Sequence, residues 1–190
     1  NFTAKCYWIV EGDIKGFFDN IDHNVMIESL WQIGIRDRRI LSIIKQMLKA
    51  GIMNECETSE LGTPQGGIIS PLLANIYLNR FDRFITGDFE RKILRRTYSR
   101  SDGRLQAMRK NSKLKTAYYV RYADDWVILT DNKEDAERLK YKAKRYLRDT
   151  LKLELSEEKT LITNVTSRPI KFLGVEIKMD VRKDRKSTRL

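Results

Sequence analysis

The stretch from Tyr119 to Leu129, YVRYADDWVIL, places two adjacent aspartates, Asp124 and Asp125, inside an otherwise apolar and aromatic run. A buried carboxylate costs several kilocalories per mole to desolvate unless a cation lies beside it. Two short apolar runs that are separated by such polar residues favour a β-hairpin over a helix. A solvated surface turn is the alternative for an Asp-Asp pair, but its flanks are rarely this rich in aromatic and β-branched residues. We therefore predict a hairpin that carries both carboxylates at its tip.

The sequence on either side of this hairpin alternates strands and helices. The run from Cys6 to Ile14 is rich in strand-forming residues and places Asp13 at its exit. Apolar residues then recur at three- and four-residue spacing after capping residues, which predicts helices. The predicted helices cover roughly 23–33 after Asp22, 37–51 with Ile40, Ile44, Met47 and Leu48 on one face, 70–84 after Ser70 and Pro71, and 132–150 after Asn132. Further strands are predicted near 160–164 and 170–178, and 61–71 predicts a loop.

The order of these elements predicts an α+β fold of the split βαβ, ferredoxin-like type. Such a fold stacks helices on one face of an antiparallel sheet and places the first strand beside the central hairpin. Asp13 would then lie near Asp124 and Asp125. Three converging carboxylates need a counter-charge, and an oxygen-only donor set favours Mg²⁺ or Mn²⁺ over softer metals. Because Mg²⁺ fills its remaining positions with water and substrate phosphate, the arrangement indicates phosphoryl transfer with two such ions.

Composition limits the class of protein. The chain has 190 residues and a formal net charge of +11, which favours a polyanionic partner, although a merely soluble basic protein is the alternative. Its apolar runs are too short for a membrane span, so we expect no membrane association. Two distant cysteines and one histidine argue against a disulfide framework or a zinc site, and a reducing interior is expected. Asn1 in place of Met and the early strand lead us to expect an internal piece of a longer protein.

Five motifs, in sequence order, resemble the reverse transcriptase domain of group II intron maturases. They are DIKGFF at 13–18, GTPQGGIISPLLANIYL at 62–78, YADD at 122–125, LSEEKT at 155–160 and FLG at 172–174. The resemblance covers nearly the whole chain. It implies a polymerase palm with part of the fingers, lacking the N-terminal fingers and the thumb. The implied boundaries are 1–20 palm, 21–69 fingers, 70–180 palm with a basic insertion at about 88–116, and 181–190 the start of a connection to the thumb.

The resemblance also implies roles for individual residues. The metal ligands would be Asp13, Asp124, Asp125 and the backbone carbonyl of Ile14, and Lys159 would assist the departing pyrophosphate. Phe18 would exclude a ribose 2′-hydroxyl, with a core phenylalanine as the alternative, and Gln65 and Gly66 would contact the nucleotide. Primer and RNA contacts are expected from Tyr122, Phe172, Leu173, Gly174, Arg95, Arg96 and Arg100. Arg121 is left without a role, because a template contact and a pair with an acid are both open.

The function implied is an RNA-directed DNA polymerase that uses two Mg²⁺ ions, for which Mn²⁺ can substitute. Its partners would be deoxynucleoside triphosphates, an RNA template with a DNA primer, and intron RNA, with a homodimer left open, and its parent would also assist intron splicing and mobility. The alternatives are an RNA-binding splicing maturase and a retron-like or CRISPR-associated reverse transcriptase. All three aspartates are present, which favours chemistry, and Phe18 argues against an RNA-copying RNA polymerase. We expect a bacterial cytoplasmic location, with an organelle as the alternative, and weak or no activity from the fragment alone.

Overall fold

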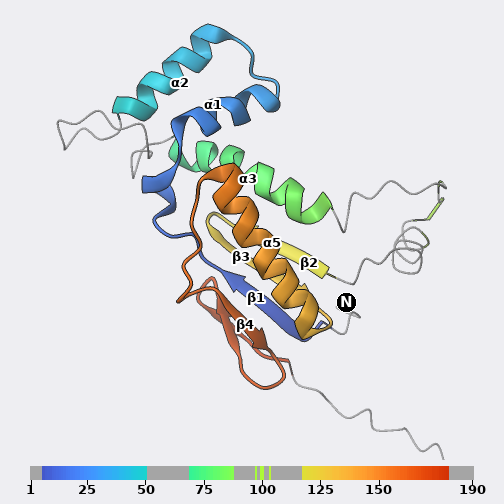
Figure 1. Cartoon of the computed structure of the whole chain (residues 1–190). Helices are drawn as coiled ribbons and strands as arrows, with labels where there is room; N and C mark the ends of the chain where they lie inside the picture. Colours follow the sequence, from blue (N-terminus) through green and yellow to red (C-terminus); the bar gives the residue numbers. More distant parts are fainter. Residues whose placement is uncertain are drawn as a thin grey trace, which may run out of the picture.

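A four-stranded antiparallel sheet forms the centre of the molecule (Figure 1). The computed structural model describes residues 6–50, 69–87, 97, 99–100, 103 and 117–179. The strands are β1 (Trp8–Gly12), β2 (Ala117–Tyr122), β3 (Asp125–Thr130) and β4 (Leu161–Asn164), in the order β2-β3-β1-β4. Every neighbouring pair is antiparallel. The predicted split βαβ order, with β1 beside the central hairpin, is confirmed.

Four α-helices and a 3-10 turn accompany the sheet in the described part of the chain. They are η1 (Phe17–Asn20), α1 (His23–Gln32), α2 (Arg38–Ala50), α3 (Ser70–Gly87) and α5 (Lys133–Leu151). The predicted caps are present where α1 and α5 begin. The Asp22 carboxylate accepts hydrogen bonds from the amides of Asn24 and Val25, and the Asn132 side chain accepts one from the amide of Asp135. No helix in these described ranges is both long and apolar enough to cross a membrane.

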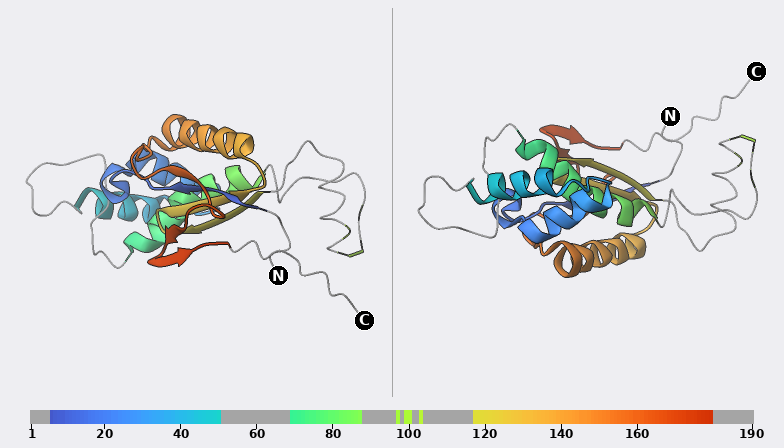
Figure 2. Two further views of the ribbon diagram at one scale, coloured as in Figure 1. Left: turned by 90° about the horizontal axis from the view of Figure 1, so that it is seen from below. Right: turned by 90° about the horizontal axis from the view of Figure 1, so that it is seen from above.

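The two faces of the sheet pack against different elements. Alternate residues of a strand point to opposite faces, so β1 and β3 contribute to two hydrophobic clusters. The first includes Val10, Trp126 and Ile128 with Leu73, Phe81, Leu139 and Leu147 of α3 and α5. The second includes Ile9, Val127, Val165 and Ile170. Figure 2 shows α5 on one side of the strands and the C-terminal hairpin on the other. The helices therefore cover one face, as predicted.

Two predicted elements differ in detail. The stretch 170–178 forms a hairpin of β5 (Ile170–Phe172) and β6 (Val175–Ile177), because Leu173 and Gly174 both have positive φ and make a tight turn. Helix α2 buries Leu41, Ile44 and Leu48, whereas Ile40 and Met47, which were predicted for the buried face, are exposed. The buried stripe is thus rotated from the predicted one. Residues 61–68 of the predicted loop and most of the basic insertion lie outside the described residues, whereas 70–71, also assigned to that loop, are already part of α3.

Tyr77 of α3 joins three helices through one buried hydroxyl. Its Oη donates a 2.6 Å hydrogen bond to the carbonyl of Leu151, where α5 ends, and accepts one from the amide of Asp22, where α1 begins. Burial raises the pKa of Tyr77, so the hydroxyl stays a donor. Asp22 also pairs with Lys152 at 2.6 Å. These contacts attach the start of α1 to α3 and to the end of α5.

Candidate active site

The sheet register brings the three aspartates to one edge. Gly12, the last residue of β1, is opposite Trp126 in the antiparallel pairing of β1 with β3. Asp13, which follows Gly12, is therefore next to Asp125, which precedes Trp126. Asp125 pairs with Tyr122 across the hairpin, which leaves Ala123 and Asp124 as its two-residue turn. We call Asp13, Asp124 and Asp125 the acidic edge. Its members come from a strand exit and a hairpin tip that are far apart in sequence.

Close packing between Gly12 and Trp126 fixes the approach of these strands. A Cβ atom added at Gly12 would overlap the six-membered ring of the Trp126 indole. That indole is buried and packs edge-on against Phe81 of α3, with the ring centroids 5.4 Å apart. Because Gly12 precedes Asp13 and Trp126 follows Asp125, this contact lies directly beneath the acidic edge.

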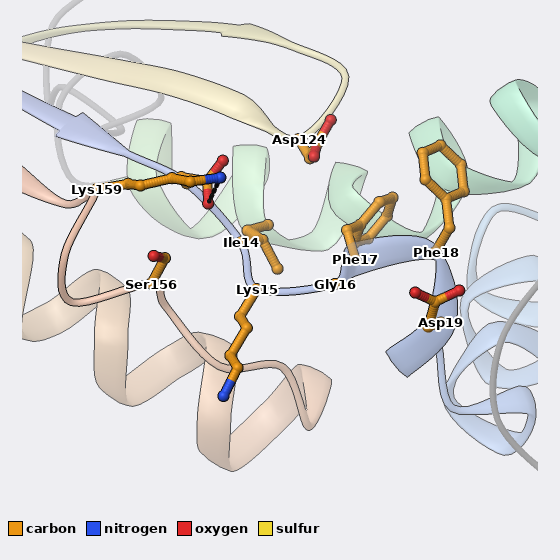
Figure 3. A pocket seen from close by; sticks show the side chains of 10 residues that line it. Ile14, Lys15, Gly16, Phe17, Phe18, Asp19, Asp124, Ser156 and Lys159 are labelled. Atoms are coloured by element: carbon orange, nitrogen blue, oxygen red, sulfur yellow. Dashed lines mark ion pairs between the residues drawn. The ribbon is translucent and has the colours of Figure 1, made fainter.

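The electrostatics of the acidic edge show that its carboxylates interact. Desolvation raises the pKa of Asp125, the negative charges of Asp124 and Asp13 raise it further, and Lys159 lowers it. The Lys159 ammonium lies 3.4 Å from Oδ2 of Asp13, an ion pair drawn as a dashed line in Figure 3. A bound cation would remove the mutual destabilisation of these charges. Lys159 supplies one such positive charge, although its side chain is 71% exposed.

The donor chemistry of this edge fits a hard divalent cation, but the side chains are not gathered around a single point. Within the described ranges, no group of three or more His, Cys, Asp or Glu side chains could hold a metal ion as placed. The backbone carbonyl of Asp13 accepts a hydrogen bond from the amide of Ser156, and the amide of Lys15 donates one to the backbone carbonyl of Glu154. Neither bond uses the carbonyl of Ile14. The ligand set of Asp13, Ile14, Asp124 and Asp125 therefore stays a prediction that requires the side chains to turn.

Two pockets meet at Asp13 and Lys159. The larger, of about 400 Å³, is also lined by Phe18, Asp124 and Ser156. The smaller, of about 170 Å³, is also lined by Asp125, Trp126, Lys171, Phe172 and Leu173. One Asp-Lys pair thus forms a wall shared by a pocket on the side of η1 and a pocket on the side of the β5–β6 hairpin.

The predicted nucleotide residues fall into two groups. Phe17 is buried in the core, edge-on to Tyr77, whereas Phe18 is half-buried, and both line the larger pocket. Both rings extend to the side of the main chain on which Asp124 lies, and Lys15 extends to the opposite side (Figure 3). Phe18 also packs against the core and edge-on to Phe17, so its role as a sugar gate and the alternative of a core phenylalanine both stay predictions. Gln65 and Gly66 lie outside the described residues.

The predicted primer and RNA residues are placed only in part. Phe172 and Leu173 line the smaller pocket, and Leu173 with Gly174 forms the hairpin turn beside it. Tyr122 is exposed where β2 ends, next to the turn that carries Asp124. Arg100 is exposed, and its predicted RNA contact stays a prediction. Arg95 and Arg96 lie outside the described residues.

Sequence reasoning missed several residues around this site. Ser156 and Lys171 line the pockets, and both stand inside or beside motifs that the sequence already displayed. Arg121 pairs with Asp82 of α3 at 2.6 Å, which resolves its open role in favour of a pair with an acid. The available signal was weak: Asn75 and Asp82 are polar residues two helical turns apart on a helix that also carries other polar and charged residues.

The strand order, the helices on one face and the carboxylates at the hairpin tip are those of a polymerase palm domain. The model of the family described as "Reverse transcriptase (RNA-dependent DNA polymerase)" matches residues 1–177. The chain belongs to the reverse transcriptase family. The resemblance that the five motifs predicted is confirmed.

The relatives include proteins encoded in group II introns. The group II intron-encoded protein LtrA of Lactococcus lactis subsp. cremoris is 38% identical over 90% of this chain and 35% of its own length. YkfC of Escherichia coli K12 is 35% identical over 88% of this chain and 46% of its own length. An uncharacterized 91 kDa protein in the cob intron of Schizosaccharomyces pombe is 33% identical over 93% of this chain and 26% of its own length. The chain thus spans about a third of LtrA and less than half of YkfC.

A solved structure supports the fold independently. Apo telomerase from Candida tropicalis superposes with a TM-score of 0.63 over 93% of this chain and 32% of its own, at 16% sequence identity. An identity this low supports the fold alone. The predicted α+β palm is therefore confirmed by both the strand order and a structural neighbour, while the boundaries of the palm and fingers stay a prediction.

Proposed function

We propose that this domain carries out RNA-templated DNA synthesis, in which the 3′-hydroxyl of a primer attacks the α-phosphate of a deoxynucleoside triphosphate. The supporting observation is the acidic edge between two pockets that share Asp13 and Lys159. A nucleotide in the larger pocket and a primer end in the smaller one would meet at that shared wall. Membership of the reverse transcriptase family supports the same reaction.

Asp13, Asp124 and Asp125, with the carbonyl of Ile14, would hold two Mg²⁺ ions, and Mn²⁺ would substitute because it accepts the same oxygen donors. When bound, such ions supply activation of the 3′-hydroxyl and neutralisation of phosphate charge. Lys159 lies on the shared wall, where its Nζ can donate a proton or a hydrogen bond to the leaving pyrophosphate. This assignment gives the three carboxylates the metal ions and Lys159 the leaving group.

The substrate would be selected by the walls of the larger pocket. Phe18 lines that pocket and offers a rigid ring where a 2′-hydroxyl would have to fit, so deoxynucleotides are favoured. Gln65 and Gly66 would complete the sugar contacts. On the other side, Phe172 and Leu173 provide apolar surface for the primer end. Gly174, in the same turn as Leu173, and Tyr122, next to the turn that carries Asp124, are proposed to add primer or RNA contacts.

The complete protein would act on RNA beyond its template. LtrA is encoded by a group II intron, and we infer by similarity that the protein containing this chain binds and helps to splice its own intron RNA. The net charge of +11 suits an RNA partner. Arg95, Arg96 and Arg100, in the basic insertion, are proposed to contribute phosphate contacts, whose strength would fall as salt is raised.

The test is primer extension by the complete protein on a primed RNA with deoxynucleotides and Mg²⁺. We expect Asp124→Asn to lower the rate at least a hundredfold, because it removes one ligand charge but preserves the side-chain shape. Asp131→Asn is the matched control, since Asp131 is an exposed aspartate at the other end of β3. Chelation should abolish extension, and added Mg²⁺ should restore it. Full activity of Asp124→Asn would refute the proposal.

A purely RNA-binding role makes a different prediction. In that case the Asp124→Asn variant would bind intron RNA with the same affinity as the wild type. Neither protein would extend a primer. The presence of all three carboxylates at one edge favours catalysis, because binding RNA requires none of them.

A further inference from the structure

Arg121 of β2 is held in the protein interior next to the acidic edge. Its side chain is only 10% exposed. Nε and Nη2 donate to the two carboxylate oxygens of Asp82 on α3, at 2.7 and 2.6 Å. This two-point geometry is the strongest that an arginine forms with a carboxylate, and it fixes the plane of the guanidinium. The orientation of the third nitrogen is thereby determined as well.

The third nitrogen reaches the turn that carries Asp124. Nη1 donates a 2.7 Å hydrogen bond to the carbonyl of Ala123 and a longer one, of 3.2 Å, to Oδ1 of Asn75. Ala123 has φ of 53°, in the left-handed region that residues with a Cβ rarely adopt. A strained residue persists where its surroundings hold it. Here the fork of Arg121 holds the carbonyl that immediately precedes Asp124.

The network stays charged and donor-competent. Burial by itself lowers the pKa of Arg121, but the hydrogen bonds and charge of Asp82 more than offset this, and the pKa is raised. Tyr119 donates from its hydroxyl to Oδ1 of Asp82 at 2.8 Å. Burial raises the pKa of Tyr119, and the Asp82 carboxylate raises it further, so this donor keeps its proton. Four hydrogen bonds inside the protein thus use four of the five N–H donors of Arg121.

We propose that Arg121 is a positioning residue: anchored to α3 by Asp82, it holds the Ala123 carbonyl and so fixes the direction in which Asp124 leaves the hairpin. The inference rests on the proposed function, because an ion-binding Asp124 is what requires a fixed direction. Arg121 touches neither pocket, and its effect passes through the backbone of the turn.

The test is Arg121→Lys in the complete protein. A lysine keeps the positive charge but cannot bond both Asp82 oxygens and the Ala123 carbonyl in one plane. We expect kcat for primer extension to fall at least tenfold, with KM for deoxynucleotide within twofold and a circular dichroism spectrum that remains wild-type. Arg83→Lys, at an exposed arginine of α3 next to Asp82, is the matched control and should leave both parameters unchanged.

A second variant separates positioning from simple structural support. Glycine adopts positive φ without strain, so Ala123→Gly in the Arg121→Lys background should recover kcat at least threefold. Because Ala123→Gly by itself relieves backbone strain, its effect on the free energy of unfolding is measured alongside, and a recovery of kcat without a matching gain in stability identifies the turn as the cause. If Arg121→Lys does not fold, Asp82→Asn, which removes the two-point pairing but preserves shape, takes its place. A folded variant with kcat within twofold of wild type would overturn the inference.

The outcome can be distinguished from failure of the polymerase proposal. Amide hydrogen exchange across residues 122–127 needs no activity, and Arg121→Lys should accelerate it at least fivefold relative to Arg83→Lys. If the wild type fails to extend primers while this acceleration is seen, the polymerase assignment is wrong and the hold on the turn stands. If Asp124→Asn is inactive but Arg121→Lys changes neither hydrogen exchange nor kcat, the positioning role is refuted and the polymerase proposal stands.

Discussion

The indole of Trp126 occupies the space into which any side chain at Gly12 would project. The two residues are direct partners across β1 and β3, and each is the neighbour of an aspartate of the acidic edge. A large rigid ring therefore packs against a residue that has no side chain. The distance between the positions of Asp13 and Asp125 depends on this contact.

Gly12→Ala should separate β1 from β3 near the acidic edge. The added methyl overlaps an indole that is already packed against Phe81, so strand and ring must shift. We expect a loss of about 1–3 kcal/mol in the free energy of unfolding, typical of overpacking, and a fall in primer extension. Urea denaturation and extension assays measure the two effects. Gly87→Ala is the control, because a Cβ there meets no atom of the described residues within 4 Å.

The cause of the Gly12→Ala effect can be checked by a second change. Phenylalanine lacks the atoms of the indole that the new methyl would meet, so Trp126→Phe should restore part of the stability lost in Gly12→Ala. Purely additive losses in the double variant would show that the Gly12-Trp126 contact is not what limits strand approach.

Lys159→Ala should affect catalysis much more than stability. The ammonium is 71% exposed and its ion pair with Asp13 is 3.4 Å long, so solvent screens most of its contribution to folding. We expect an unchanged melting temperature and a kcat at least tenfold lower, since the group that would assist pyrophosphate departure is lost. Lys178→Ala, at another exposed lysine, is the control. Unaltered kcat would remove Lys159 from the mechanism.

Phe18→Ala should relax the choice of sugar. The side chain lines the larger pocket, and its removal opens space beside the nucleotide. We expect the preference for deoxynucleotides over ribonucleotides, measured as a ratio of kcat/KM, to fall at least tenfold. Phe84→Ala is the control, because Phe84 stacks on Tyr146 and lines neither pocket. A Phe18→Ala protein that still rejects ribonucleotides would exclude Phe18 as the gate.

Asp22→Asn should make stability less dependent on acid pH. Burial raises the pKa of Asp22, but Lys152 and the amides of α1 lower it more, so it lies below the ordinary value of 3.8. The carboxylate thus stabilises the fold above pH 3.8 and loses this effect as the pH falls through the lower folded-state pKa. At pH 7 we expect Asp22→Asn to cost up to about 1 kcal/mol, since asparagine retains the helix cap and Lys152 is exposed.

The measurement for Asp22 is urea denaturation of wild type and variant between pH 2 and pH 7. The difference between them should shrink below pH 4, when the wild-type carboxyl takes up its proton. Asp22→Ala, which also removes the cap, should cost about 1 kcal/mol more at every pH. A difference that is constant with pH would show that the Lys152 pair contributes nothing.

Local patterns in the sequence predicted most of the fold. The hairpin around Asp124 followed from two short apolar runs separated by polar residues, and the helix starts at Asp22 and Asn132 followed from side chains that bond the backbone within three residues. The strand order followed from the order of elements, because a split βαβ chain has few ways to form one sheet. Five motifs then sufficed to identify the family.

Contacts between distant residues were beyond that reasoning. The sequence indicates neither that Trp126 packs on Gly12 nor that Arg121 pairs with Asp82. Each contact forms only when distant strands and helices are packed together. The apolar face of α2 was predicted only in part: Ile44 and Leu48 are buried, but Ile40 and Met47 are exposed, and only the packing of neighbouring elements decides which apolar residues of this helix are covered. The turn at Leu173 and Gly174 was read as continuous strand because apolar residues flank a single glycine.

The buried hydroxyl of Tyr77 has a mechanical consequence. One oxygen bonds the first residues of α1 and the last carbonyl of α5, so neither helix end can be displaced without breaking a bond that water cannot replace inside the core. Moving the start of α1 relative to the end of α5 therefore breaks a buried hydrogen bond, and this cost couples the positions of the two helix ends.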